Sequence, residues 1–326
     1  MNRPVPEVPP AVREKARRLG RRGQEWLTGL PDLVAELERR WSLTAGAPLD
    51  RATSAYVLRV RTGDGRAAVL KLAVPDPDFP NTLRTLQRAE GQGYVSLLAH
   101  DAQRHALLLE SLGAPLDQLG LPVPRQLGIL CATLRRAWRV PPPEDAVAAE
   151  DALAAAEPEK ARALAAMVER LWDGLGRPCS ERVVDRALDC AGRRAAAFDP
   201  GRCVVVHGDP HPGNALRATV PRPGAETGFV FVDPDGFLDE PAYDLGVALR
   251  GWCAELLAGD AVRLARSYCS LLAERTGVDA GAVWEWGFLE RVSTGLYLLD
   301  HGAEASARPY LDTAELLAAA EAPADG

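Results

Sequence analysis

The sequence predicts an α+β fold with two lobes, a small lobe built on antiparallel strands and a larger lobe made mostly of helices. Three observations lead to this prediction. The chain has 326 residues, more than a single hydrophobic core usually organises. Residues 56–110 contain two pairs of short apolar runs, the pattern of β-hairpins. From residue 113 onward, apolar residues recur mainly at helical spacing. We therefore expect lobes at 1–112 and 113–326.

The small lobe is expected to begin with helical structure. Its first ten residues are proline-rich and are expected to be loosely tethered. Leu33, Val34, Leu37 and Trp41 then recur at helical spacing. Pro31 suits the first turn of a helix, because its missing N–H has no intrahelical partner there. We therefore predict a helix that begins at Pro31.

Two hairpins and an interposed helix complete the small lobe. The first hairpin turns at Thr62-Gly63-Asp64-Gly65, a strong turn signal between two apolar runs. After the second hairpin, the segment 110–113 leaves the sheet and is interpreted as the hinge between the lobes. The predicted elements are strands at 56–61 and 67–74, a helix at 83–88 and strands at 94–98 and 106–110.

The large lobe is expected to be helical with a few short strands. Three consecutive prolines at 141–143 should break the chain after its first helix. Prolines and glycines at 220–228 predict an exposed hairpin tip. The predicted elements are a helix at 122–138, alanine-rich helices to 198, strands at 203–206, 215–218 and 229–232, and helices from 243 to the end.

Composition excludes several classes of protein. The formal net charge of −7 argues against a nucleic-acid-binding surface; it suits a cationic ligand, or serves only solubility. No run of 18 apolar residues could span a membrane, and the first ten residues lack the apolar core of a signal peptide. The six cysteines show no zinc-ligand spacing. We expect them to be reduced, in a cytoplasmic protein.

The octapeptide His207–Asn214 and the run Phe229–Asp233 are the most informative motifs of the chain. Each adjoins a predicted buried strand, so their polar residues stand at strand ends. Asp209 can orient a hydroxyl group and accept its proton. Asn214 and Asp233 offer the oxygen ligands that Mg²⁺ prefers, next to nucleotide phosphates. This spacing predicts phosphoryl transfer.

A lysine within the predicted strand 67–74 points to the same chemistry. Strand alternation places Lys71 on one face with Val69 and Ala73. A lysine inside an apolar strand needs a partner, because an unpaired buried charge is costly. Nucleotide phosphates would supply that partner.

These motifs resemble those of the aminoglycoside phosphotransferases, antibiotic kinases with a protein-kinase-like fold. Three N-terminal segments, Gly23–Trp26, Ala68–Leu72 and Gly91–Val95, are similar to the streptomycin 6-phosphotransferase and hydroxyurea phosphotransferase branch. The resemblance extends from about Gly23 to about His301, most of the chain. It implies a protein-kinase-like arrangement of the two lobes, with ATP and Mg²⁺ bound between them.

The resemblance also implies roles for single residues. Asp209 would be the catalytic base, and Lys71 would bind the phosphates of ATP. Ser54 and its neighbour Thr53, in a loop at 46–55, are candidate phosphate contacts. In the hinge, Glu110 and Leu112 would line the nucleotide site.

The sequence departs from the family at the acidic partner of Lys71. Kinase-like proteins pair this lysine with an acid on the following helix, yet residues 81–86 contain no acid. The nearest candidate is Asp78, at or before the start of that helix. Asp78 could reach Lys71, or it could cap the helix.

The remaining polar residues of the motifs have supporting or acceptor-binding roles. His207 is expected to fix the catalytic loop by hydrogen bonds, and Asp244 to bond backbone N–H groups of the same loop. His211 could shape the loop or touch phosphate. Asp235 and Glu240 are expected to contact a cationic acceptor.

The sequence thus predicts an ATP- and Mg²⁺-dependent phosphotransferase that acts on a hydroxyl group of a small molecule. The resemblance favours an aminocyclitol antibiotic such as streptomycin as the acceptor. Two alternatives stay open. One is a kinase of the same fold acting on hydroxyurea or a cell metabolite, and the other is a nucleotide-binding pseudokinase without turnover.

Overall fold

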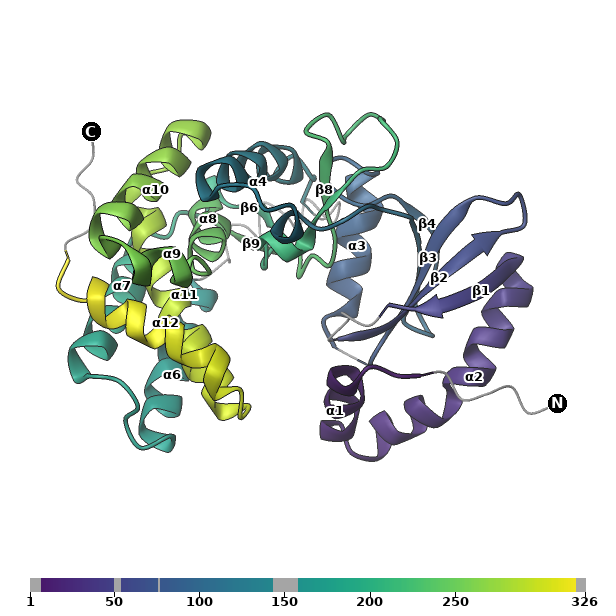
Figure 1. Ribbon diagram of the computed structural model, residues 1–326, viewed down its shortest axis with the longest axis horizontal. Helices are drawn as coiled ribbons and strands as arrows, with labels where there is room; N and C mark the ends of the chain where they lie inside the picture. Colours follow the sequence, from purple (N-terminus) through teal and green to yellow (C-terminus); the bar gives the residue numbers. More distant parts are fainter. Residues whose placement is uncertain (1–6, 50–53, 76, 143–157, 321–326) are drawn as a thin grey trace.

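The computed structural model describes residues 7–49, 54–75, 77–142 and 158–320. Figure 1 shows a sheet of long strands at one side of the molecule and a group of packed helices at the other. The small-sheet, large-helical arrangement expected from the sequence is confirmed. The division at residue 112 stays a prediction.

The small lobe contains one five-stranded antiparallel sheet of order β1-β2-β3-β5-β4. Helix α3 follows β3 in the chain, and its buried residues join the core of the large lobe. The elements are β1 Leu43–Pro48, β2 Ala55–Thr62, β3 Ala67–Ala73, α3 Phe79–Ala89, β4 Leu97–Asp101 and β5 Ala106–Glu110.

Strand β3 separates two hydrophobic cores by the alternation of its side chains. Leu70 and Leu72 belong to a core shared with the N-terminal helices, whereas Val69 and Ala73 pack toward the core of the large lobe. Lys71 shares the face of Val69 and Ala73, as the alternation predicts. Its ammonium group therefore points toward the region between the lobes.

Helices α1 (Pro10–Arg18) and α2 (Arg21–Trp41) cover the outer face of the sheet. The prediction that a helix begins at Pro31 is wrong, because Pro31 lies inside α2. Burial of Leu30, Val34 and Leu37 against the sheet offsets the local cost of the missing N–H.

The edges of the sheet differ from the predicted pattern. The segment 46–55 was expected to be a loop, yet β1 continues to Pro48. An edge strand tolerates glycine and proline, because one side of it makes no ladder hydrogen bonds. The strand expected at 94–98 is also shifted to β4. Tyr94 forms a bridge to Phe231 of the large lobe instead.

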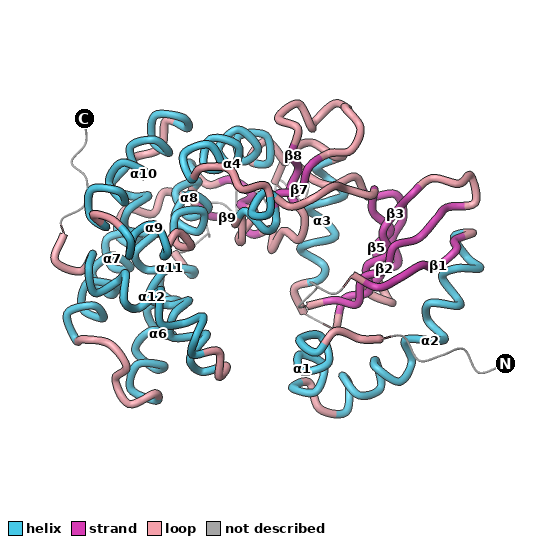
Figure 2. Tube along the Cα trace, in the orientation of Figure 1, coloured by secondary structure: helices cyan, strands magenta, loops and turns pink. Residues whose placement is uncertain are grey.

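The large lobe is mostly helical, and α11 (Ala280–Asp300) runs through its centre (Figure 2). Helix α11 contacts α6, α7, α8, α10 and α12 and buries an almost continuous surface, which includes Trp284, Trp286 and Phe288. The other helices are α4 Val123–Ala137, α6 Glu159–Gly174, α7 Glu181–Ala196, α8 Pro241–Leu249, α9 Cys253–Ala258, α10 Ala261–Thr276 and α12 Glu304–Leu317.

Two short antiparallel pairs connect the helices to the sheet. Strand β6 (Val204–Val206) pairs with β9 (Phe237–Asp239), and β7 (Ala215–Arg217) pairs with β8 (Phe229–Phe231). The strands expected near 203–206, 215–218 and 229–232 are therefore present. Together they bring the ends of β6 and β8, which carry the polar motifs, to one place.

The connection between β7 and β8 is a hairpin loop that is exposed at most of its residues, as expected for 220–228, but its centre is packed against the protein. Gly224 and Ala225 are buried. Arg222 forms an ion pair with Glu110 at the end of β5 and donates to the carbonyl oxygens of Gly91 (2.7 Å) and Tyr94 (2.8 Å). This connection therefore ties the large lobe to the end of β5 and to the segment that precedes β4.

Two chemical expectations can be compared with the described residues. None of the described helices combines the length and the apolar character needed to cross a membrane. None of the six cysteines, all of which lie in the described ranges, forms a disulfide. That they are reduced stays a prediction.

Candidate active site

The catalytic motif begins where β6 ends. His207 is fully buried, and Gly208 has φ +92°, in the left-handed region that favours glycine. A Cβ atom at Gly208 would lie 2.6 Å from the Cβ of Asp235. Only glycine therefore lets the loop turn this close to the segment that follows β8.

Asp244, in the first turn of α8, binds the backbone of this loop. Its carboxylate accepts hydrogen bonds from the backbone N–H groups of His207 (2.8 Å) and Gly208 (2.9 Å). It also accepts one from the indole N–H of Trp138 (2.8 Å). The side chain is fully buried, and burial raises its pKa to about 6. The contact with the loop backbone is the one that the resemblance implies.

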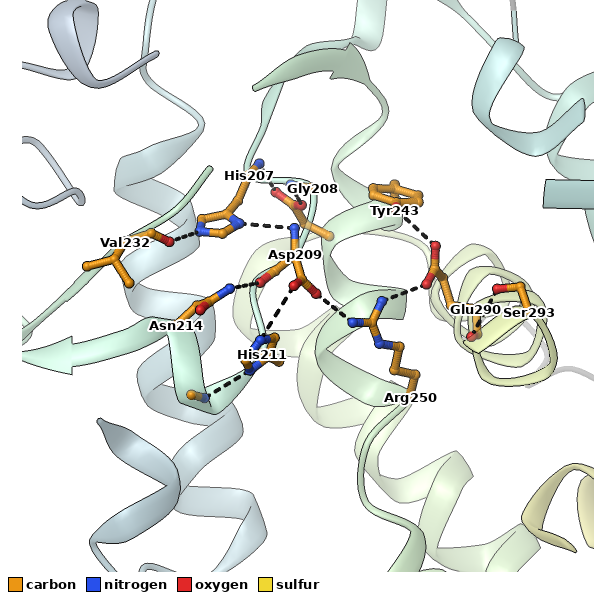
Figure 3. A network of polar contacts seen from close by, with 12 residues as sticks. His207, Gly208, Asp209, His211, Asn214, Val232, Tyr243, Arg250, Glu290 and Ser293 are labelled. Atoms are coloured by element: carbon orange, nitrogen blue, oxygen red, sulfur yellow. Dashed lines mark hydrogen bonds and ion pairs between the residues drawn. The ribbon is translucent and has the colours of Figure 1, made fainter. Parts of the chain in front are cut away.

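His207 fixes the loop from the other side (Figure 3). Its Nδ1 accepts the backbone N–H of Asp209 (3.0 Å), so its Nε2 carries the proton and donates to the carbonyl oxygen of Val232 (2.9 Å). Burial lowers the pKa of His207 to about 4, which keeps the ring neutral. The histidine therefore connects the loop 207–214 to the strand end at 229–233 by hydrogen bonds.

The carboxylate of Asp209 lies between two cationic or potentially cationic groups (Figure 3). Arg250 Nη2 is 2.5 Å from Oδ1, and His211 Nε2 is 3.5 Å from Oδ2. Burial alone would raise the pKa of Asp209, but His211 and the charge of Arg250 lower it below its usual range. Asp209 is thus a carboxylate at neutral pH.

Asn214 and Asp233 lie close to this group. The Nδ2 amide of Asn214 donates to the backbone oxygen of Asp209 (2.9 Å), which leaves its carbonyl oxygen for another ligand. Asp233 has φ +57°, an uncommon conformation for a non-glycine residue that often marks functional sites. The backbone N–H of Val232, the neighbour of Asp233, donates to the backbone carbonyl oxygen of Asn214 (2.9 Å), so β8 and the loop bring the two predicted metal ligands near each other.

Lys71 contacts Asp233 directly, with 2.5 Å between Nζ and Oδ1. The lysine is 8% exposed, so the carboxylate supplies the partner that its burial demands. Asp78 occupies the N-cap position of α3, but its side chain makes no capping hydrogen bond. The ion pair of Lys71 with Asp233 joins the small lobe to the catalytic motif.

The two residues expected to bind the acceptor differ in their surroundings. Asp235 is exposed, and partial desolvation together with the charge of Asp209 raises its pKa to about 6. Glu240 accepts a hydrogen bond from the indole of Trp286 (2.7 Å) and contacts Arg194 (3.3 Å). Both of its oxygens face Arg194, so Glu240 is already engaged within the protein.

The nucleotide-binding candidates lie at opposite ends of β3: Ser54 lies beside its last residues, and Glu110 pairs with Ala68 near its start. Ser54 lies in a bend before β2, and Thr53 lies outside the described residues. Glu110 is engaged by Arg222, and it also accepts the backbone N–H of Ser96 (2.8 Å). Leu112 is half-buried against the core of the large lobe. The segment 110–113 is therefore held mainly through the side chain of Glu110.

Behind this site lies a cavity of about 520 Å³ between α3, α6 and β9. Three cations, Arg84, Arg88 and Lys160, and two acids, Glu159 and Asp239, line it. Burial raises the pKa of Asp239 to about 7. The cations outnumber the acids on this wall, which disfavours a cationic acceptor inside the cavity.

Sequence reasoning missed Arg250 and its partner Glu290. Arg250 follows the apolar helix α8, and Glu290 lies within the apolar helix α11. Each is a charged residue among residues that are otherwise buried, and such residues need partners. This pattern was the available signal, but it does not reveal which two charges meet.

Comparison with known proteins gives the same picture. The model of the family described as "Aminoglycoside/hydroxyurea antibiotic resistance kinase" matches residues 40–302. The chain is 30% identical to a streptomycin 6-kinase of Streptomyces glaucescens over 302 residues, covering 92% of this chain and 93% of that protein. It is 34% identical to a hydroxyurea phosphotransferase of Kitasatospora aureofaciens over 275 residues, covering 78% and 74%.

Solved structures share the fold at low sequence identity. The structure of choline kinase LicA from Streptococcus pneumoniae matches with a TM-score of 0.56 and 12% identity, over 89% of this chain and 99% of that one. A GDP complex of aminoglycoside 2'-phosphotransferase-IIIa matches with a TM-score of 0.53 and 15% identity, over 88% and 98%. The kinase-like fold expected from the sequence is therefore confirmed.

Proposed function

Since this chain belongs to the aminoglycoside/hydroxyurea antibiotic resistance kinase family, we propose that it phosphorylates a hydroxyl group of an aminocyclitol antibiotic such as streptomycin, with ATP as the phosphate donor. The observation that supports the proposal is the chain of contacts that links Asp209 to Asn214, Asn214 to the strand end that carries Asp233, and Asp233 to Lys71. A positioned carboxylate, two oxygen ligands and one cation are the parts that phosphoryl transfer requires.

In this proposal Asp209 orients the acceptor hydroxyl and accepts its proton. The acceptor oxygen forms a bond to the γ-phosphorus of ATP as the bond to the β–γ bridging oxygen breaks, and ADP leaves with that electron pair. Because the transition state is loose, most of the catalytic gain comes from positioning and charge. The low pKa of Asp209 suits this role, since an orienting acceptor need not be a strong base.

Asn214 and Asp233 would hold Mg²⁺. Among the described residues no three His, Cys, Asp or Glu side chains gather into a metal site. Two oxygen ligands nevertheless fit Mg²⁺, which commonly takes one or two protein ligands and completes its shell with phosphates and water. When bound, the ion would neutralise charge on the phosphates. Lys71, Ser54 and the hinge residues Glu110 and Leu112 would bind the rest of the nucleotide.

Streptomycin is proposed over hydroxyurea because the site combines several acids with a neutralised arginine. Asp209 and Glu290 both bind Arg250, and the charge of Asp209 also acts on Asp235, so these three acids outnumber the arginine and favour a cationic acceptor. Asp235 is the proposed contact for that acceptor. Glu240, predicted for the same role, supports the site in this proposal through its bonds to Arg194 and Trp286.

The decisive experiment measures ADP release with a panel of acceptors: streptomycin, other aminoglycosides, hydroxyurea and simple amino alcohols. We expect streptomycin-dependent turnover, a phosphorylated product by mass spectrometry, and resistance in a sensitive bacterial host. Turnover with hydroxyurea alone would replace the acceptor and keep the kinase chemistry. No turnover with any acceptor, together with retained nucleotide binding, would favour the pseudokinase alternative.

Replacing Lys71 should raise the KM for ATP and lower kcat. A Lys71→Met enzyme would lose a cation that faces phosphate charge in a partly desolvated cleft, where Coulomb interactions exceed those in water. Steady-state kinetics at varied ATP would measure both effects. Asp78→Asn should reproduce part of the loss if Asp78 assists Lys71. Unchanged kinetics for Asp78→Asn would show that Asp233 alone holds the lysine.

Replacing Asp235 by asparagine should raise the KM for streptomycin and leave the KM for ATP unchanged. The change keeps the size of the side chain and removes the charge that would pair with a guanidinium group. Asp173→Asn is the matched control, because Asp173 is an exposed acid of α6 that forms an ion pair with Arg177. An equal KM for streptomycin in the Asp235 and Asp173 variants would contradict the acceptor contact.

A further inference from the structure

Arg250 connects the proposed catalytic carboxylate to a buried acid of the central helix (Figure 3). It caps the C-terminal end of α8, and its backbone N–H is bonded to the carbonyl oxygen of Gly246. Its Nη2 lies 2.5 Å from Asp209 Oδ1, and its Nη1 lies 2.7 Å from Glu290 Oε2. One guanidinium group thus bridges two carboxylates from different parts of the chain.

The far end of this bridge is fixed. The side chain of Glu290 is 5% exposed, and its second oxygen accepts the hydroxyl hydrogen of the buried Tyr243 (2.9 Å). Tyr243 is itself clamped edge-on against Trp286, with 5.0 Å between ring centroids. Charge-assisted hydrogen bonds are short and directional, so a fixed Glu290 fixes the plane of the Arg250 guanidinium. The orientation of Asp209 is therefore set from α11.

We propose that Arg250 is the positioning residue of the catalytic carboxylate: it occupies Oδ1 of Asp209 and thereby leaves Oδ2 to receive the acceptor hydroxyl. The inference deepens the proposed function and rests on the assignment of Asp209 as the base. The proton of the acceptor hydroxyl passes to Oδ2, on the side of His211, while Oδ1 keeps its bond to Arg250. The arginine touches no reacting atom in this role.

The geometry separates positioning from simple charge neutralisation. A lysine at position 250 would keep the charge, but a single ammonium group cannot reproduce the planar fork that bridges Asp209 and Glu290. A methionine would remove both bonds and keep most of the packing volume. Comparing the two variants therefore separates the effect of losing the charge from the effect of losing the orientation of Asp209.

The test is a double-mutant cycle on kcat, run with the acceptor that the wild-type enzyme phosphorylates. Arg250→Met should lower kcat by about 10²-fold, the cost of a small misplacement of a catalytic group, with little change in the KM for ATP. Arg250→Lys should recover part of that loss. In an Asp209→Asn background, Arg250→Met should lower kcat little further, because groups that act as one unit are not additive.

Arg104→Met is the matched control. Arg104 also bridges two carboxylates, Glu36 (2.7 Å) and Asp101 (3.1 Å), but it lies in the small lobe, away from Asp209. It should keep kcat at the wild-type value. If Arg250→Met behaved like Arg104→Met, or if the Asp209 and Arg250 losses multiplied, Arg250 would have no positioning role. A wild-type enzyme without turnover on any acceptor would instead contradict the proposed function.

Discussion

Replacing Asp209 by asparagine is expected to lower kcat by roughly 10² to 10⁴, the scale of a positioned acid–base group. The amide keeps the size of the side chain but cannot accept the acceptor's proton. Binding of the Mg²⁺-nucleotide should change little, since Lys71, Asn214 and Asp233 remain. Single-turnover kinetics and nucleotide titration would measure the two quantities separately.

A second variant distinguishes this loss from damage to nucleotide binding. Asp233→Ala should also abolish turnover, but it should weaken Mg²⁺-dependent nucleotide binding as well. It removes a proposed metal ligand and leaves Lys71, 8% exposed, without its carboxylate partner. Near-normal turnover of Asp209→Asn on the true substrate would show that the catalytic loop has been wrongly assigned.

Replacing Asp244 by alanine should give the largest loss of stability of any single change at the site. The substitution leaves three donors without this acceptor: the buried N–H groups of His207 and Gly208 and the part-buried indole N–H of Trp138. The expected loss in the free energy of unfolding is roughly 3 to 5 kcal/mol, because unsatisfied buried donors keep their full desolvation cost. Urea titration followed by intrinsic fluorescence would measure it.

Asp260→Ala provides the comparison for Asp244. Asp260 is an exposed acid that caps α10 by accepting one N–H, from Arg263 (3.0 Å). Its loss should cost about 1 kcal/mol, the usual effect of an N-cap substitution. If the two variants were equally stable, Asp244 would not be the main support of the catalytic loop.

The general fold followed from local patterns in the sequence. The turn Thr62–Gly65 and the alternation around Lys71 predict the β2–β3 hairpin and its two faces correctly, because both depend on neighbours in the chain. Pro31 and the β1 edge strand were wrong. Their conformations depend on the burial of α2 against the sheet and on the edge position of β1, and neither is visible in a short window of sequence.

The grouping of the candidate site residues could be predicted from the sequence about as well as the fold. His207, Asp209, Asn214 and Asp233 share one region because each stands at the end of a short apolar strand. Arg250 was missed because its partners lie 41 and 40 residues away in the chain. A charged residue in an apolar helix indicates that a partner exists, but only the packing of α8 on α11 shows which residue that partner is.

The connection between β7 and β8 has a practical consequence for engineering. A designer who wished to fuse a tag or split the enzyme would choose residues 220–228, since proline- and glycine-rich loops usually tolerate insertion. Here Gly224 packs so closely that an added Cβ would lie 2.5 Å from the carbonyl oxygen of Gly91, and Arg222 grips the hinge acid Glu110. Because Glu110 is a proposed nucleotide-binding residue, an insertion there would be expected to weaken nucleotide binding through Arg222 and Glu110. No residue of 220–228 need contact the nucleotide itself.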